Sequence, residues 1–157
     1  MLDPIDRQLL TLLQQDARLS NAELGQRVGL TASSVYQRVK KLQQQGIIKG
    51  YIAAVDPVAL GKPITAFIRL TVGASADQPY AAAKEAFVRG CLAEPDILEC
   101  HGVAGEDCYV LKVRVADPLQ LESLLDRLRS KAMIDNTVSS IVLSTVKETT
   151  RVEPADQ

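Results

Sequence analysis

The stretch 31–50 carries the side chains with the clearest chemical potential in this 157-residue chain. It holds four cations, Arg38, Lys40, Lys41 and Lys49, and no acid. Arginine and lysine bind phosphate, and serine and glutamine hydrogen-bond to base edges. A helix here with Val35, Val39 and Leu42 inward would turn a polar set outward. That set is a candidate DNA-binding surface: Ser33, Ser34, Gln37, Arg38 and Lys41.

The distribution of charge supports this interpretation. Residues 1–50 hold seven basic and four acidic residues, a net of +3, whereas the whole chain has a net charge of −1. A basic half joined to an acidic half is typical of a binding face on one part of a chain. The alternative is a three-helix packing unit whose basic face is merely solvated.

His101 is the only histidine, and it lies beside Glu99 and Cys100. Alternate residues of a strand face opposite sides, so His101 and Cys100 would not converge on a metal or a substrate. The chain shows no Gly-rich phosphate loop, no catalytic carboxylate pair and no zinc-ligand spacing. We therefore expect no enzyme activity, no metal site and no cofactor.

The three cysteines, Cys91, Cys100 and Cys108, are odd in number and lack CxxC spacing. A disulfide framework is not expected, and a reducing compartment fits. The N-terminus shows no signal-peptide pattern, and no apolar run approaches the roughly 18 residues of a membrane span. The sequence predicts a cytoplasmic protein without membrane association.

Three short helices are predicted in the first third of the chain. Asp3 can cap the first, with Pro4 at its first helical position. Ser20 and Glu23 form a capping box that opens the second, and Gly29 ends it. Thr31 caps the third, which runs to about Gln45. Two helices joined by a tight turn behind a supporting helix predict a helix-turn-helix, whose second helix enters the major groove.

A β-rich run follows from Ile47 to Val55, interrupted by Lys49 and Gly50. We expect a short hairpin or a bent strand here, which would be the wing of a winged helix-turn-helix. Asp56 and Pro57 break it. The tail after Thr150 is polar and is expected to be frayed.

The second part of the chain alternates strands and helices. Its order is βαββαβ, the ferredoxin-like arrangement, so the fold class is α+β. Such a sheet has helices on one face only, and the uncovered face favours dimerisation. The expected elements are a strand at 64–72, a helix at 80–92, strands at 97–103 and 108–115, a helix at 118–131 and a last strand at 138–146.

Several motifs resemble the DNA-binding half of the Lrp/AsnC, or feast/famine, family almost position by position. They are Leu2-Asp-x-x-Asp6-x-x-Leu9-Leu10, then Asp16-Ala-Arg18-Leu-Ser20-Asn-x-x-Leu24-Gly-x-x-Val28-Gly-Leu30-Thr, then Val35-x-x-Arg38-Val39-Lys-x-Leu42-x-x-x-Gly46-Ile-Ile-Lys-Gly50-Tyr. Asp56-Pro57-x-x-Leu60-Gly61 resembles the linker of the family. The resemblance implies a transcriptional regulator that binds double-stranded DNA through residues 1–50. A linker strand and hinge would follow at 51–63, and a ferredoxin-like domain for effector binding and oligomerisation at 64–150.

The resemblance also implies an effector, usually an amino acid, bound between homodimers that assemble further, commonly into octamers. The loop that resembles the family's effector loop supplies glycines, whose backbone amides approach a carboxylate, and acids that hold an α-amino group. This chain has Cys108 where the family often has Asp. The implied effector residues are Gly102, Gly105, Glu106, Asp107, Cys108, Thr137, Ser139 and Ser140.

Two other functions remain open from the sequence. One is an architectural, nucleoid-type DNA binder without effector response. The other is a sensor whose helix-turn-helix serves only protein contacts. The loop at 102–107 also has a simple alternative, which is a turn without a ligand.

Overall fold

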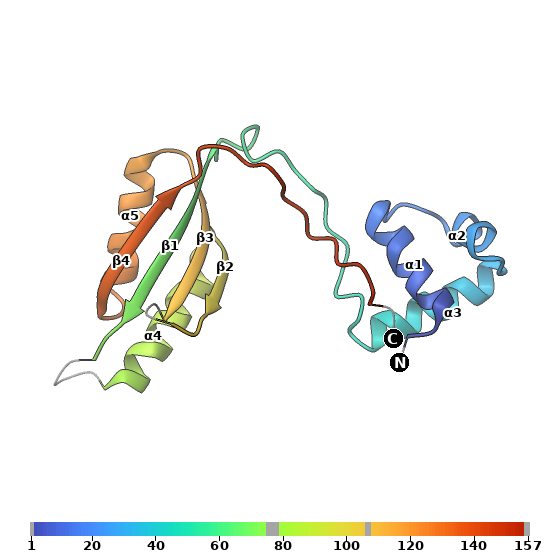
Figure 1. Cartoon of the computed structure of the whole chain (residues 1–157), viewed down its shortest axis with the longest axis horizontal. Helices are drawn as coiled ribbons and strands as arrows, with labels where there is room; N and C mark the ends of the chain where they lie inside the picture. Colours follow the sequence, from blue (N-terminus) through green and yellow to red (C-terminus); the bar gives the residue numbers. More distant parts are fainter. Residues whose placement is uncertain (1, 75–78, 106–107, 156–157) are drawn as a thin grey trace. The chain divides into compact units, whose positions relative to one another are not determined.

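The computed structural model describes residues 2–74, 79–105 and 108–155. Contacts divide the chain into two units (Figure 1). The helical unit comprises residues 1–54 together with 147–157, and the sheet unit comprises residues 55–146. Each unit has its own hydrophobic core.

The helical unit contains the three predicted helices, α1 (Pro4–Gln15), α2 (Asn21–Val28) and α3 (Ala32–Gln44). Their predicted caps are confirmed. The Asp3 carboxylate accepts a hydrogen bond from the backbone N–H of Asp6, and Ser20 and Glu23 form the reciprocal capping box. Thr31 accepts from the N–H of Ser34. These bonds satisfy backbone donors that have no partner inside a helix.

The core of this unit joins all three helices. Leu9 from α1, Leu24 from α2 and Val35 from α3 are at most 1% exposed. Full burial of each such side chain contributes about 1.5–3 kcal/mol. These helices of 8 to 13 residues are marginal in isolation, so the shared core holds them together.

Two glycines shape the turn between α2 and α3. Gly29 has φ +71°, the left-handed conformation that glycine adopts without strain. Gly25 lies inside α2, and a Cβ there would stand only 2.4 Å from the carbonyl oxygen of Leu30. The N–H of Leu30 donates to the Gly25 carbonyl at 2.9 Å. A side chain at position 25 would therefore push the turn away from α2.

The prediction of a wing at residues 47–55 is wrong, because the chain forms no strand there. The N–H groups of Ile47 and Ile48 both bond to the carbonyl of Leu42, which closes the end of α3. Beyond them Ile52 is 86% exposed and Val55 62% exposed. A β-prone sequence becomes a strand only where another backbone is available to pair with it. The helix-turn-helix itself is confirmed.

The prediction of a frayed tail is also wrong for part of the tail. The side-chain amide of Gln14 on α1 forms two hydrogen bonds with the backbone of Val152. Its Nε2 donates to the carbonyl at 2.9 Å, and its Oε1 accepts from the N–H at 2.8 Å. The Arg7 guanidinium donates to the carbonyl of Ala155 at 3.1 Å. Side chains of α1 thus satisfy the tail backbone, which polarity of the tail alone does not reveal.

The sheet unit confirms the βαββαβ order. Its elements are β1 (Ile64–Val72), α4 (Tyr80–Ala93), β2 (Ile97–Gly102), β3 (Tyr109–Val115), α5 (Pro118–Arg129) and β4 (Ile134–Ile141). The sheet order is β2-β3-β1-β4, and every neighbouring pair is antiparallel. None of the helices in the described ranges has the length and apolar character needed to cross a membrane.

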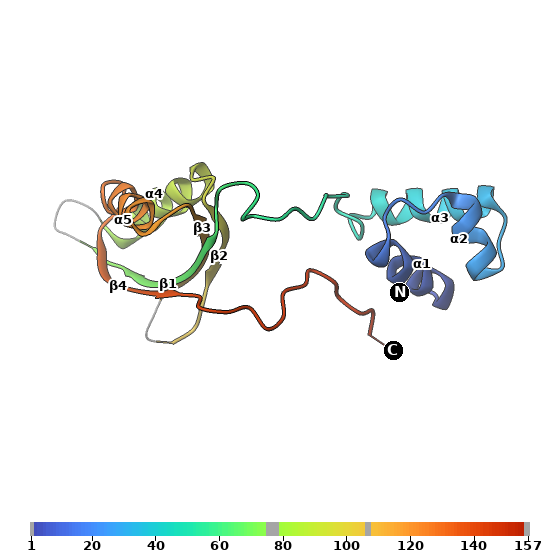
Figure 2. The same ribbon diagram turned by 90° about the horizontal axis from the view of Figure 1, so that it is seen from above.

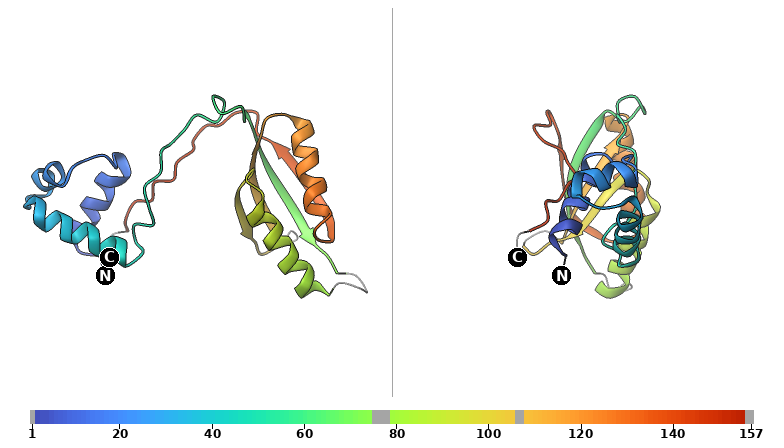
Figure 3. Two further views of the ribbon diagram at one scale, coloured as in Figure 1. Left: turned by 180° about the vertical axis from the view of Figure 1, so that it is seen from behind. Right: turned by 90° about the vertical axis from the view of Figure 1, so that its right-hand side faces the viewer.

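Helices α4 and α5 lie on the same face of this sheet (Figures 2 and 3). On β1, Ala66, Ile68 and Leu70 are fully buried against this layer, in one core with Phe87 and Leu124. The intervening β1 side chains point to the other face, as the period of a strand requires. Phe67 there is 41% exposed.

The last strand begins four residues and ends five residues earlier than predicted, at Ile134–Ile141 instead of 138–146. The run from Ile141 to Val146 is richer in β-branched residues, but pairing with β1 decides where the strand lies. Thr71 pairs with Asn136, and Ala66 pairs with Ile141. Beyond the sheet, Leu143 and Val146 are at least 97% exposed.

A buried carboxylate joins α4 to α5. Glu94 is 8% exposed and accepts hydrogen bonds from the Nε and Nη2 of Arg127, at 3.0 to 3.2 Å, and from Lys131 at 3.2 Å. The hydrogen bonds from Arg127 hold the pKa of Glu94 below its ordinary value of 4.5, and they outweigh the opposing effect of burial. A lowered pKa means that this ion pair stabilises the fold at neutral pH and that the stabilisation is lost as the pH falls through the folded-state pKa.

We predict that Glu94→Gln lowers the free energy of unfolding at pH 7 by about 1–2 kcal/mol, because hydrogen bonds to a charged group become bonds to a neutral one. The loss should shrink as the pH falls below 4.5, because the carboxylate of the unfolded chain takes up a proton there before the folded-state carboxylate does, and it should vanish below the lowered folded-state pKa. Urea unfolding followed by circular dichroism at pH 7 and at pH 3.5 measures both effects. Glu85→Gln, an exposed carboxylate on the same helix, is the control and should change neither value.

A second prediction concerns the docked tail. Gln14→Ala removes both hydrogen bonds to Val152, so hydrogen exchange at the Val152 amide should accelerate about tenfold. Gln15→Ala, the neighbouring substitution on α1, is the matched control. Equal exchange rates in the two variants would show that the tail is not held by Gln14.

Candidate functional site

The most outward line of α3 is polar along its whole length. Ser33, Gln37, Lys40 and Gln44 follow one another at intervals of four, three and four residues, which places them on one face of a helix. All four are exposed, and the buried Val35 and Leu42 occupy the opposite face. We call these four residues the outer line of α3. Their side chains can hydrogen-bond to base edges or bind phosphate.

Part of this surface was not predicted from the sequence. Lys40 and Gln44 belong to the outer line but were not predicted, and the exposed Tyr36 lies beside them. The ammonium of Lys40 stands 5.9 Å from the ring centre of Tyr36, within range of a cation–π interaction. Placing the residues of α3 around the helix axis at 100° per residue puts Lys40 and Gln44 on the face opposite Val35, so the sequence could have revealed both. Tyr36 is aromatic, and its residue type alone does not predict that it is exposed.

Four of the five predicted DNA-binding residues are exposed: Ser33, Ser34, Gln37 and Lys41. The hydroxyl groups of Ser33 and Ser34 lie 3.1 and 2.9 Å from the Thr31 hydroxyl at the start of α3. Lys41 lies on the flank of α3, beside the outer line. These residues surround the N-terminal end and one side of the helix.

Arg38 does not point outward as expected. Its Nη1 donates to the carboxylates of Asp3 and Asp6, both at the start of α1. The distance to Asp6 is 2.8 Å, and the Arg38 side chain is 32% exposed. Spacing along α3 cannot reveal this bond, because the two carboxylates belong to another helix.

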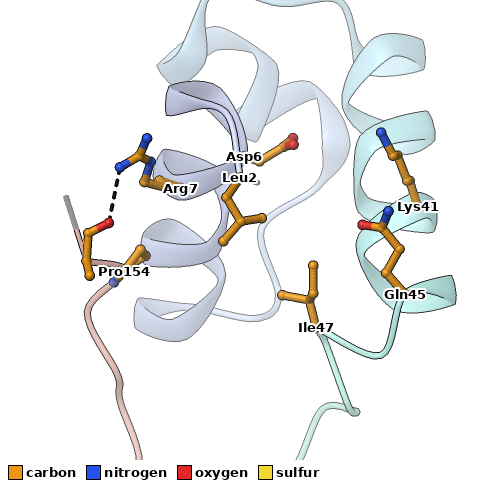
Figure 4. Close-up of a pocket in the computed structure, with 8 residues that line it drawn as sticks. Leu2, Asp6, Arg7, Lys41, Gln45, Ile47 and Pro154 are labelled. Atoms are coloured by element: carbon orange, nitrogen blue, oxygen red, sulfur yellow. Dashed lines mark hydrogen bonds between the residues drawn. The ribbon is translucent and has the colours of Figure 1, made fainter. Parts of the chain in front are cut away.

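A hollow of about 340 Å³ opens between the start of α1, the end of α3 and the tail (Figure 4). Lys41 and Gln45 of α3 face it from one side, and Leu2 and Arg7 from the other. Ile47, Pro154 and Ala155 complete the wall near the tail. None of the four outer-line residues lines this hollow, and all four stay exposed beside the docked tail.

The loop between β2 and β3 is closed by backbone hydrogen bonds. Val103 N–H donates to the carbonyl of Cys108, and Cys108 N–H donates to the carbonyl of Leu70, each at 3.0 Å. Gly105 has φ +138°, a conformation that side chains disfavour. Gly102 and Gly105 are exposed, and Cys108 is half-buried. The predicted effector residues Glu106 and Asp107 lie outside the described residues.

Gly102 and Thr137, two of the predicted effector residues, lie far apart within one chain, whereas Cys108 lies nearer to Thr137 through its bond to Leu70. Gly102 pairs with Tyr109, Tyr109 with Leu70, and Leu70 with Thr137, so the four residues form one row across the sheet. Three strand spacings separate the ends of this row by about 14 Å.

The three predicted hydroxyl groups also divide between the two faces of the sheet. Thr137 and Ser139 pair with the buried Leu70 and Ile68 and share their face. Ser140 pairs with Phe67 and belongs to the uncovered face. The strict alternation of a strand separates neighbours that look like one cluster in the sequence.

His101 does not join the cysteines, because Cys100 lies on the other face of β2, where its thiol is hydrogen-bonded to that of Cys91. The Nε2 atom of His101 lies 3.2 Å from the Glu99 carboxylate, on the face opposite Cys100. No group of residues able to hold a metal ion occurs within 2–74, 79–105 and 108–155. Burial raises the pKa of the Cys91 thiol to about 12, which makes this thiol a poor nucleophile at neutral pH.

Comparison with protein-family models matches both units. Residues 2–43 match the AsnC-type helix-turn-helix domain, and residues 65–152 match the Lrp/AsnC ligand binding domain. The first range contains Ser33, Gln37 and Lys40 of the outer line, and the second contains the sheet from Thr65 of β1 onward.

Individual relatives cover almost the whole chain. It is 38% identical to the HTH-type transcriptional regulator LrpA of Mycobacterium tuberculosis, over 92% of this chain and 91% of that protein. It is 36% identical to the leucine-responsive regulatory protein of Escherichia coli K12, over 96% of this chain and 90% of that protein. The crystal structure of a Neisseria meningitidis transcriptional regulator in complex with L-methionine superposes with a TM-score of 0.87 at 33% identity, covering 97% of this chain and 96% of the other.

A helix-turn-helix with an exposed polar recognition helix, joined to a ligand-binding domain, defines a class of DNA-binding transcriptional regulators. Within that class the chain belongs to the Lrp/AsnC family. The resemblance inferred from the sequence motifs is thus confirmed.

The outer line of α3 leads to a prediction for DNA binding. Lys40→Ala should weaken binding and reduce the slope of log K against log salt concentration by about one, because one phosphate contact is lost. Lys84→Ala, an exposed lysine on α4 of the sheet unit, is the matched control for charge. Fluorescence anisotropy with a labelled duplex at several salt concentrations measures both. An unchanged slope in Lys40→Ala would remove Lys40 from the phosphate contacts.

Proposed function

We propose that this regulator is sequence-specific and that an amino acid controls its affinity for DNA. The observation that carries the proposal is the outer line of α3, which presents serine, glutamine and lysine side chains with no apolar or acidic residue among them. Direct readout of the major groove uses such side chains. Ser34 and Lys41 would add backbone contacts beside this line. The site of action is the cytoplasm, where a bacterial-type regulator meets its DNA, and no catalytic step is part of the function.

The uncovered face of the sheet supports homodimer formation. The aromatic Phe67 and the apolar Val138 lie exposed on it, next to the partly buried Val110. A second sheet would bury this face. A two-fold dimer then presents two copies of α3 to half-sites about 34–36 Å apart, or a multiple of that distance. Further assembly of dimers, up to an octamer, would bring the loop of one copy near β4 of another.

The effector proposal follows from the row across the sheet. The loop offers glycine backbone at Gly102 and Gly105, and β4 offers hydroxyl groups about 14 Å away at the other edge. A shared site between copies of the chain reconciles these positions. Relatives of known structure support an amino-acid effector: the structures of the Neisseria regulator and of a feast or famine regulatory protein of M. tuberculosis are both complexes with L-methionine. The effector of this chain would also be an amino acid.

Calorimetry against the twenty amino acids tests this directly. We expect at least one to bind and to change DNA affinity by about 5- to 150-fold, the usual range of coupling between sites. Gly105→Ala should weaken amino-acid binding more than tenfold, because a side chain strains the loop backbone. Gly61→Ala, another glycine with positive φ in the same unit, is the control for strain. If no amino acid binds, the loop is only a turn.

A subunit-mixing experiment tests whether the site is shared between copies. Hetero-oligomers of Gly105→Ala and Thr137→Ala subunits, co-expressed with two different tags, should regain a fraction of intact sites. Each variant alone should have none. If the mixed oligomers recover no amino-acid binding, Gly105 and Thr137 do not form one site shared between two copies of the chain.

Specificity has its own test. The protein should enrich defined duplexes from a random library and bind them at least a thousandfold more tightly than mixed-sequence DNA at physiological salt. Equal affinity for both would favour the architectural alternative. Absence of salt-sensitive DNA binding would favour the protein-contact alternative.

A further inference from the structure

The Arg38 side chain lies between the two helices α1 and α3 of the helical unit. It leaves the middle of α3 and reaches the first turn of α1, where its Nη1 donates to both Asp3 and Asp6. The same Asp3 carboxylate accepts the backbone N–H of Asp6 at 2.8 Å and so caps α1. One acid therefore starts α1 and also holds the middle of α3.

The charges around Arg38 do not suit a phosphate contact. Two carboxylates surround one guanidinium, so the cluster carries a net negative charge. The hydrogen bond from Arg38 lowers the pKa of Asp3, and the hydrogen bonds to Asp3 and Asp6 raise the pKa of Arg38, so the charges of Asp3 and Arg38 persist at neutral pH. A phosphate arriving at Arg38 would meet two anions as well as the cation.

The direction of Arg38 differs from that of the outer line. Arg38 follows Gln37 by one residue, which is a rotation of about 100° around the helix axis. This rotation carries its side chain toward α1 and away from Ser33, Gln37, Lys40 and Gln44. The apolar contact between α1 and α3 runs through Leu9 and Val35, and the ion pair adds a fixed polar point beside it.

We infer that Arg38 is a positioning residue. Its bond to Asp3 and Asp6 sets the rotation and height of α3 against α1, and so the direction in which the outer line meets a base pair. Hydrogen-bond readout tolerates errors of only about 0.5 Å and 10–20°, so a small rotation of α3 removes base discrimination before it removes phosphate contacts. This inference rests on the proposed DNA-binding function and replaces the direct DNA contact expected for Arg38.

The test is a double-mutant cycle of Arg38→Ala and Asp3→Asn. Asparagine keeps the cap of α1, because its carbonyl oxygen accepts the Asp6 N–H, but it turns an amide donor toward Arg38. Asp16→Asn is the matched control, with the same change of charge at the opposite end of α1. Binding is measured by anisotropy at several salt concentrations, with a duplex enriched by the wild-type protein and with a mixed-sequence duplex.

For a positioning role, Arg38→Ala and Asp3→Asn should each weaken binding to the enriched duplex by about tenfold, and the double variant should be no weaker than either, because both changes break one interaction. Binding to the mixed-sequence duplex and the salt slope should stay at wild-type values. Asp16→Asn should match the wild type. Thermal melting of each variant checks that the helical unit is folded. If Asp3→Asn does not fold, Asp6→Asn replaces it in the cycle.

Two results would overturn the inference. One is a salt slope that falls by about one in Arg38→Ala, which indicates a phosphate contact. The other is tighter binding by Asp3→Asn than by Asp16→Asn, which indicates that the carboxylate restrains a DNA-binding arginine. Failure of the wild-type protein to bind either duplex would instead contradict the proposed function, so the two failures are distinguishable.

Discussion

The antiparallel pairing of β1 with strands on both sides is the constraint on which the sheet unit depends. β1 lies between β3 and β4, and its alternating side chains divide the sheet into two faces. Ala66, Ile68 and Leu70 need the cover of α4 and α5, whereas Phe67 remains on the bare face. The same pairing places β2 and β4 at opposite edges of the sheet.

The helical unit must keep α3 folded while one face of that helix stays exposed to solvent. None of its helices is long enough to be stable alone, so each depends on its cap and on the core formed by Leu9, Leu24 and Val35. The core uses only one stripe of α3. The opposite face of α3 does not contribute to the core, so it can carry polar side chains that are solvated in the free protein and available to contact DNA.

Polar bonds between segments distant in the sequence connect the pieces of the helical unit. Arg38 joins the middle of α3 to the start of α1, and Gln14 joins the end of α1 to Val152 in the tail. Residue type and spacing along the helix predict that both side chains are exposed to solvent. Each acquires a partner because the fold brings an unsatisfied carboxylate or backbone group beside it, and buried or half-buried polar groups are stabilised by such partners.

The sequence alone determined the features that depend on neighbours along the chain. The caps at Asp3, Ser20 and Thr31, the stop at Gly29, the βαββαβ order and the family motifs are local patterns, and the structure and comparisons confirm them. Only the tertiary structure decided the rest. It placed β4 by its register with β1, left residues 47–55 unpaired, and turned Arg38 toward α1. The physical reason is that a strand and an ion pair each need a partner from elsewhere in the chain, and the identity of that partner is set by packing and not by sequence spacing.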